Sequence, residues 1–214
     1  VYVPAGSLES YKVADYWRDM NIMEARIPNN QIWYIAPLLV SPYRSGIEVF
    51  GANILSNDWD SVTGKGVITF DADVTTVGDK AFYGYNTSSA YLISVTIPHS
   101  VINIGEEAFF RCERLTNVSM GDSITSIGYN AFHFCHKLTS ITIPESVTYI
   151  GHHAFWDTVY KDGGVLKGVT EINVEASEEE FKEIHRGDSW RPQYDYLLFK
   201  KSVGVNYSSQ RTEG

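Results

Sequence analysis

A short pattern of apolar and small residues recurs four times along the chain. It reads Ile or Val, Gly, two variable residues, Ala and Phe, and its glycines stand at positions 78, 105, 128 and 151. Upstream of the last three copies, apolar residues at steps of three and two precede a serine, and both patterns then return every 23 residues. A fixed period of this length predicts stacked units rather than a globule with one central core.

Each unit is predicted to contain a short strand and a helical return. Val95-Thr96-Ile97 alternates apolar and polar residues, as a strand does, and the apolar residues of 105–112 fit one face of a one- or two-turn helix or a helical turn. We therefore expect an α/β solenoid with one parallel strand per unit and short helices or turns on its back. Its predicted core consists of Leu92, Val95, Ile97, Phe109, Leu115, Val118, Phe132, Leu138, Ile141, Ile143 and Phe155.

Degenerate units extend the array to residues 67–177, which gives about five rungs. The first contains Ile68, Phe70 and Asp73, and the last contains Ile172 and Val174. Four extra residues around 86–91 and eight in the 156–168 region lengthen two of the connections. We expect these two insertions to form loops at the side of the array.

The remaining residues are expected to close both ends of the array. Residues 1–30 predict a helical segment with Ser7 as its N-cap, and residues 31–66 predict a β cap with strands at 31–35 and 46–50. In residues 178–214, a capping box predicts a helix that runs to about Arg186 and ends at Gly187. Two closing strands are then predicted at 194–199 and 202–207.

The units resemble the BspA-like leucine-rich repeats of bacterial surface proteins. That consensus runs Leu-x-x-Val-x-Ile-Pro-x-Ser-Val-x-x-Ile-Gly-x-x-Ala-Phe-x-x-Cys, and residues 92–112 match it at nearly every fixed position. The resemblance implies a right-handed leucine-rich-repeat solenoid in an extracellular or surface-attached bacterial protein that binds other macromolecules. It suggests host extracellular-matrix proteins or partner bacteria as targets, and residues 1–30 resemble the tail of a preceding array. Because the chain begins at Val1, we expect any export signal or anchor to lie outside it.

Composition narrows the function classes. The chain of 214 residues has 17 basic and 26 acidic side chains, a net charge of −9, which argues against a nucleic-acid partner. Its 43% hydrophobic and 14% aromatic residues exclude a disordered acidic tail. No apolar run approaches the roughly 20 residues of a membrane helix, so we expect no membrane insertion.

The sequence does not indicate catalytic machinery, a cofactor or a metal site. His133, His136, His152 and His153 could approach one another on adjacent units, but they occupy variable positions that fit a solvated surface better than a metal site. Cys112 and Cys135 occupy one slot in successive units, where buried thiols are expected and a disulfide between rungs is the alternative. We therefore expect a protein that is not an enzyme.

Binding remains the expected function. On the sheet, Thr96, Ser119 and Thr142 are predicted to face outward within a nearly uncharged field, and Trp156 and Tyr160 are hot-spot candidates in the second insertion. Arg186, Gly187 and Asp188 form an integrin-type tripeptide. The expected function is adhesion to a host or bacterial surface protein, and the alternative is a carbohydrate-binding accessory protein that stacks sugars on exposed tryptophans, with Trp33, Trp59, Trp156 and Trp190 as candidates.

Overall fold

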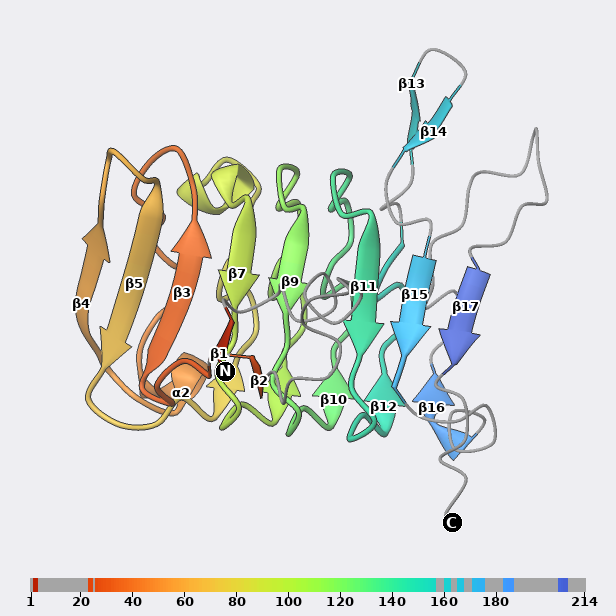
Figure 1. Cartoon of the computed structure of the whole chain (residues 1–214), viewed down its shortest axis with the longest axis horizontal. Helices are drawn as coiled ribbons and strands as arrows, with labels where there is room; N and C mark the ends of the chain where they lie inside the picture. The colour runs from red at the N-terminus through yellow and green to blue at the C-terminus, as the bar shows by residue number, and fades with distance from the viewer. Residues whose placement is uncertain are drawn as a thin grey trace.

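The computed structural model describes residues 2–3, 23–24, 26–156, 160–162, 165–167, 171–175, 183–186 and 204–207. Its strands stand side by side along one long axis (Figure 1). One five-stranded sheet has the order β4-β5-β3-β7-β9, and a three-stranded sheet has the order β11-β15-β17. Their bounds are β3 Gln31–Ile35, β4 Ile54–Trp59, β5 Lys65–Phe70, β7 Ser94–Thr96, β9 Asn117–Ser119, β11 Ser140–Ile143, β15 Glu171–Val174 and β17 Gly204–Tyr207.

A second parallel ladder runs along the array. It consists of β6 (Thr76–Val77), β8 (Asn103–Ile104), β10 (Ser126–Ile127), β12 (Tyr149–Ile150) and β16 (His185–Arg186). The expectation of one strand per unit was therefore wrong, because each regular unit supplies two. The solenoid of 23-residue units with parallel sheets is confirmed.

The return after each glycine is a series of turns. In the second unit, the N–H groups of Glu107, Phe109 and Arg111 each donate to a carbonyl of the following unit at 2.8 Å, while the intervening N–H groups donate back within the turn. In a helix every N–H group points along the helix axis. Here successive N–H groups alternate in direction, so the segment is not a helix. The alternation uses left-handed backbone at Glu107 and Arg111 (φ 52° and 57°). Equivalent positions in neighbouring units share it, at Lys80, Asn130, Phe134 and His153.

The glycine column fixes how closely the units stack. A Cβ atom on Gly105 would lie 2.5 Å from the backbone nitrogen of Asp79, and one on Gly128 would lie 2.6 Å from the carbonyl carbon of Gly105. These distances are shorter than any non-bonded contact that a Cβ atom can make with rigid backbone. Glycine is thus required here because one unit packs directly on the backbone of its predecessor.

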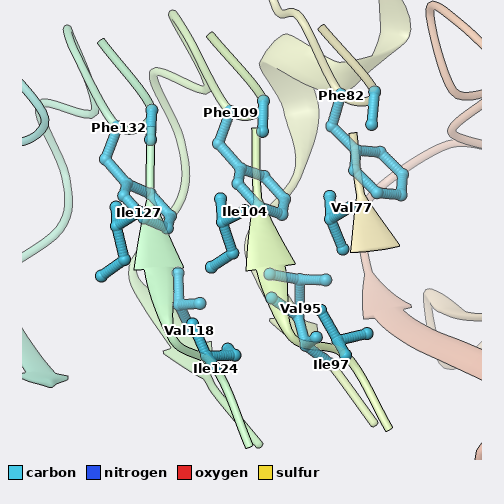
Figure 2. Packing of buried hydrophobic residues seen from close by; sticks show 14 of the residues in the cluster. Val77, Phe82, Val95, Ile97, Ile104, Phe109, Val118, Ile124, Ile127 and Phe132 are labelled. Atoms are coloured by element: carbon cyan, nitrogen blue, oxygen red, sulfur yellow. The ribbon is translucent and has the colours of Figure 1, made fainter. Parts of the chain in front are cut away.

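Phenylalanine rings from successive units form one continuous stack inside the array (Figure 2). Ring centroids are 5.4 Å apart for Phe82–Phe109, 5.2 Å for Phe109–Phe132 and 5.5 Å for Phe132–Phe155, with planes within 11° of parallel. Strand residues such as Val95 and Val118 repeat beside them in the same way. All eleven predicted core residues are buried, from 0% exposure for Leu92 to 8% for Val118.

The first sheet begins differently from the predicted regular array. The strand that contains Ile68 and Phe70, β5, does not neighbour β7, because β3 lies between them and pairs antiparallel with both. The alternation of β3 explains its place, since Ile32 and Tyr34 are buried while Trp33 is exposed. The first unit therefore joins the parallel ladders through β6 alone, which corrects the expectation of a full rung there.

Residues 46–50, predicted as a strand, instead form the one-turn helix α2 (Ile47–Phe50). Gly46 and Gly51 flank it at φ 106° and 76°, conformations that glycine adopts without strain, so the chain can turn in and out within four residues. The carbonyl of Val49 accepts from the N–H of Gly78 at 2.7 Å, as the carbonyl of Val77 does from Gly105. This helix therefore takes the position of a preceding unit.

The remaining elements lie at the insertions and ends. The first insertion forms the 3-10 helix η1 (Ser88–Tyr91), and the second contains the hairpin of β13 (Tyr160–Asp162) and β14 (Val165–Lys167). β1 (Tyr2–Val3) pairs with β2 (Met23–Glu24), whereas the predicted helix after Ser7 lies outside the described residues. The predicted C-terminal helix does not reach Arg186, because His185–Arg186 pair with β12 as a strand. β17 lies within the closing strand predicted at 202–207 and pairs in parallel with β15, at the edge of the three-stranded sheet.

Candidate functional site

Four strands present one uncharged outward surface, which we call the outer sheet face. Its outward side chains are Gln31, Trp33 and Ile35 of β3, Ser94 and Thr96 of β7, Asn117 and Ser119 of β9, and Ser140 and Thr142 of β11. Strand register places Trp33 opposite Thr96, and Thr96 opposite Ser119. Thr142 is the equivalent residue on β11, which lies beside β9 (Figure 1). The structure thus brings three predicted binding residues onto one face.

Trp33 is the largest side chain on this face. It is 39% exposed, and its indole N–H donates to the side-chain oxygen of Gln31 at 2.7 Å, which holds the ring against its own strand. On the buried side of the same strand, Tyr34 donates its hydroxyl to Asn57, and burial raises the pKa of Tyr34. A strand anchored by Tyr34 on one side therefore carries an exposed indole on the other.

The position of Trp33 within the repeat sheet was missed in the sequence. Residues 31–35 read as part of a separate cap, because local alternation shows which side chains share a face but not which strand lies next to them. β3 lies between β5 and β7 because it pairs with strands that are distant in the sequence. The polar Gln31 was the available signal, because the strand period of two places Trp33 on the same face as Gln31.

Other predicted binding residues lie away from the outer sheet face. Trp156 is half-buried at the end of a turn, with its ring 4.6 Å from that of His153. Tyr160 begins the β13–β14 hairpin, which projects beyond the sheet, and its side chain lies outside the described residues (Figure 1). Arg186 is a half-buried residue of β16, and the remaining tripeptide residues, Gly187 and Asp188, also lie outside the described residues.

The other candidate tryptophans differ from Trp33. The half-buried Trp59 donates its indole N–H to the carbonyl of Ala36 at 3.1 Å, so its polar atom serves the fold. Trp190 lies outside the described residues. Of the candidate stacking platforms that the structure describes, Trp33 is the one on the outer sheet face.

His133, His136, His152 and His153 belong to one cluster of aromatic rings on the turn side of the array. The ring of His133 stacks on Phe134 at 4.1 Å, and its Nδ1 lies 3.0 Å from the side-chain oxygen of Asn130. Burial, followed by the charges of His153 and Arg111, lowers the pKa of His133 to about 4. Across the described ranges, no three His, Cys, Asp or Glu side chains group so as to hold a metal ion.

Both cysteines are free and fully buried thiols. The Sγ of Cys112 lies 3.1 Å from the carbonyl oxygen of Phe82, and that of Cys135 lies 3.2 Å from that of Phe109. Burial raises the pKa of both thiols. Thiols held protonated in a core serve packing rather than nucleophilic chemistry.

This geometry defines the protein as a repeat scaffold with a preformed, exposed sheet face. The family model for the BspA type leucine-rich repeat region matches residues 62–181 in six copies. The chain therefore belongs to the BspA-type leucine-rich-repeat family, whose members are generally non-enzymatic repeat scaffolds that typically bind proteins. Within the described part of the chain, no helix is both long enough and apolar enough to cross a membrane.

Solved structures of bacterial leucine-rich-repeat proteins are similar to this chain. One from Bacteroides capillosus is 35% identical (TM-score 0.32) and covers 45% of this chain and 62% of its own. A leucine rich cell surface protein from Faecalibacterium prausnitzii is 27% identical (TM-score 0.41) and covers 65% and 31%. One from Bacteroides ovatus is 25% identical (TM-score 0.40) and covers 63% and 31%. The chain thus spans less than two thirds of each, and a search of curated proteins gives no significant match.

Proposed function

We propose that this protein is a non-catalytic adhesion module that binds a host or bacterial surface protein through the outer sheet face. The observation that carries the proposal is Trp33, a 39% exposed indole set among uncharged polar side chains on a hydrogen-bonded sheet. Trp is enriched among residues that dominate binding energy. A sheet that needs no ordering on association also loses little conformational entropy.

The charge distribution supports a protein partner. The chain carries a net charge of −9, yet the outward side chains of β3, β7, β9 and β11 carry no charge. Depletion of charge is the compositional signal of the core of a protein interface, and its surrounding rim is polar. Lys65 of β5 lies opposite Ile35, and Asp58 of β4 lies opposite Val67, which is itself opposite Trp33. These two charged residues would form such a rim.

The proposed setting is the bacterial cell surface or the extracellular space. Family membership supports this setting. Extracellular-matrix proteins and surface proteins of other bacteria are the proposed partners. Trp156, Tyr160 and the tripeptide at Arg186 remain candidates for contacts outside the outer sheet face.

A carbohydrate ligand is the second candidate, favoured by the same indole. An exposed aromatic ring next to the hydroxyls of Thr96 and Ser119 offers an apolar surface beside hydrogen-bonding groups, as a sugar requires. The short reach of these side chains limits the number of hydrogen bonds to each sugar. We therefore rank a protein partner first.

The test compares a panel of immobilised collagen, laminin, fibronectin and bacterial surface extracts with a glycan array. Trp33→Ala should weaken binding to the recognised protein at least tenfold, because it removes the largest side chain on the outer sheet face. Tyr149→Ala is the matched control, since Tyr149 is also 39% exposed but lies on the second ladder, and binding should stay within twofold.

Three results would decide against the proposal. Trp33-dependent binding on the glycan array alone would favour the carbohydrate function. Equal binding by Trp33→Ala and the unaltered protein would remove the outer sheet face from consideration. Inhibition by a soluble Arg-Gly-Asp peptide, with no effect of Trp33→Ala, would move the site to the tripeptide.

A further inference from the structure

A hollow of about 660 Å³ lies between the first insertion and the following turn of the array. Residues of the segment 84–91 other than Ser89 form one wall, Arg111, Glu113 and Arg114 form the other, and Leu38 also lines the hollow. The side chains that matter for its chemistry are Tyr85, Tyr91, Arg111, Glu113 and Arg114. A volume of this size lies in the range of ligand sites.

Aromatic rings hold both arginines of the hollow. The guanidinium carbon of Arg111 lies over the ring of Tyr85 at 4.9 Å and over that of Phe134 at 4.8 Å. Arg114 lies over the ring of Tyr91 at 5.0 Å. A ring that covers the flat face of a guanidinium leaves its in-plane N–H groups as donors, and those groups match a carboxylate in bidentate geometry.

The hollow has spare positive charge. The Nη1 atom of Arg111 is 4.0 Å from the nearest carboxylate oxygen of Glu113, beyond hydrogen-bond distance, and Glu113 is 51% exposed. Two cations and one anion thus line the hollow, whereas the whole chain is acidic at −9. A local excess of the opposite sign favours an anionic ligand through charge complementarity.

The insertion wall is fixed by its own hydrogen bonds. The hydroxyl of Thr87 accepts from the N–H of Ser89 and donates to the carbonyl of Tyr83, and the hydroxyl of Ser88 bonds to the backbone of Ser41. These contacts engage two hydroxyls that line the hollow. An acidic side chain presents a carboxylate on an apolar stem, which matches the guanidinium donors and the aromatic walls of the hollow.

We propose that this hollow binds an acidic side chain, Asp or Glu, of a peptide segment in a protein partner. Arg111 supplies the held guanidinium, Arg114 the second cation, and Tyr85 and Tyr91 the apolar walls. The site is separate from the outer sheet face and adds a charged anchor to the proposed function, so a partner with an acidic loop would engage both.

The test uses fluorescence anisotropy with a labelled Glu-Leu-Glu-Leu-Glu peptide and a Gln-Leu-Gln-Leu-Gln counterpart. The acidic peptide should bind, and binding should weaken as sodium chloride rises from 50 to 300 mM because salt screens exposed charges. Arg111→Gln and Arg114→Gln should each weaken binding at least tenfold. Glu113→Gln should strengthen it about twofold to fivefold, because it removes a competing carboxylate.

Two controls separate the site from general charge and from folding. Arg26→Gln removes the same charge from an exposed residue that pairs with Asp122, and it should leave affinity within twofold. Arg111→Lys keeps the charge and should give an intermediate loss, because Lys lacks the planar fork. Trp33→Ala should leave peptide binding unchanged, which makes failure of the hollow and failure of the outer sheet face distinguishable.

The proposal fails if the Gln peptide binds as well as the Glu peptide, or if Arg26→Gln and Arg111→Gln have equal effects. Binding of an oligogalacturonate but not of the acidic peptide would assign the hollow to a uronate instead. Loss of binding by both Arg111→Gln and Glu113→Gln would show that the wall, rather than the guanidinium, was disturbed, and would also overturn the proposal.

Discussion

Single backbone positions set the 23-residue repeat of this protein. Each turn needs a glycine where the previous unit's backbone approaches within 2.5–2.7 Å of a Cβ position, and a left-handed residue two positions later. Lys80, Glu107, Asn130 and His153 hold that left-handed conformation without being glycine. The N–H groups of Lys80, Glu107 and Asn130 donate hydrogen bonds to the next unit, and these bonds offset the conformational strain.

Gly105→Ala tests the close stacking of the units. The added methyl would meet the backbone of Gly78 and Asp79, which cannot rotate away, so the free energy of unfolding should fall by about 1–3 kcal/mol. Urea unfolding measures it. Glu106→Ala alters the exposed neighbouring residue and should stay within about 0.5 kcal/mol. Equal stability of the two variants would contradict the close approach.

His133 should make the protein sensitive to acid. Its pKa is about 4 when folded but near 6.5 when unfolded, so unfolding takes up a proton between these values. The stability that the neutral ring provides is complete above pH 6.5 and is lost as the pH falls toward 4. The groups around it are Arg111, His153, His136 and Glu107.

Urea unfolding between pH 4.5 and 7 checks this dependence. His133→Phe should reduce the slope of the unfolding free energy against pH, by at most the slope that uptake of one proton produces. Phe134→Leu disturbs the same ring cluster without removing a titratable group, and it should lower stability equally across the range. An unchanged slope in His133→Phe would mean that other groups cause the acid dependence.

The elements of this fold are short and depend on neighbouring units for their hydrogen bonds. The strands of the second ladder have two residues each, and the turns on the back bond alternately forward and inward. An apolar spacing of one and four residues suits a helix as well as these turns, so it could not separate them. Turns form because alternate N–H groups donate to carbonyls of the next unit, which a helix would not allow.

The helix α2 should stabilise the whole N-terminal end. The buried ring of Phe50 contacts Phe70 at 5.0 Å and Phe82 at 6.0 Å, so it closes the phenylalanine stack. Phe50→Ala should lower the unfolding free energy by about 3–4 kcal/mol, as for other buried Phe truncations. Ile47→Ala, at a 62% exposed position of the same helix, should change it by less than about 0.5 kcal/mol. Similar losses in both variants would show that helix formation matters rather than the ring.

The whole molecule is a quasi-linear array in which a unit contacts its immediate neighbours. Neighbouring Phe rings stack at 5.2–5.5 Å, and side-chain hydrogen bonds repeat at separations of 23 residues, such as Thr125 to Ile102 and Thr148 to Thr125. Stability of such an array is close to a sum of unit terms and nearest-neighbour terms. Coupling between distant units should therefore be small.

Double-mutant cycles measure this coupling directly. Phe109→Leu with Phe132→Leu, in adjacent units, should deviate from additivity by about 0.5–3 kcal/mol in unfolding free energy. Phe82→Leu with Phe155→Leu, three units apart, should add within about 0.5 kcal/mol. Comparable coupling in both cycles would show that the array behaves as a single cooperative core.

Sequence periodicity determined the repeat, its 23-residue spacing and its buried positions, because each unit repeats the same local environment and the same apolar slots. The outward placement of Thr96, Ser119 and Thr142 follows from the same alternation, whereas the family was indicated by the resemblance of residues 92–112 to its consensus. Tertiary structure alone decided how the ends close: β3 inserts beside β7, α2 replaces a unit, and Arg186 joins a strand. The hollow at Arg111 is likewise tertiary, since residues 20 or more apart form its walls. Local patterns record which side chains are buried, whereas pairing between distant segments depends on backbone hydrogen bonds that every residue can make.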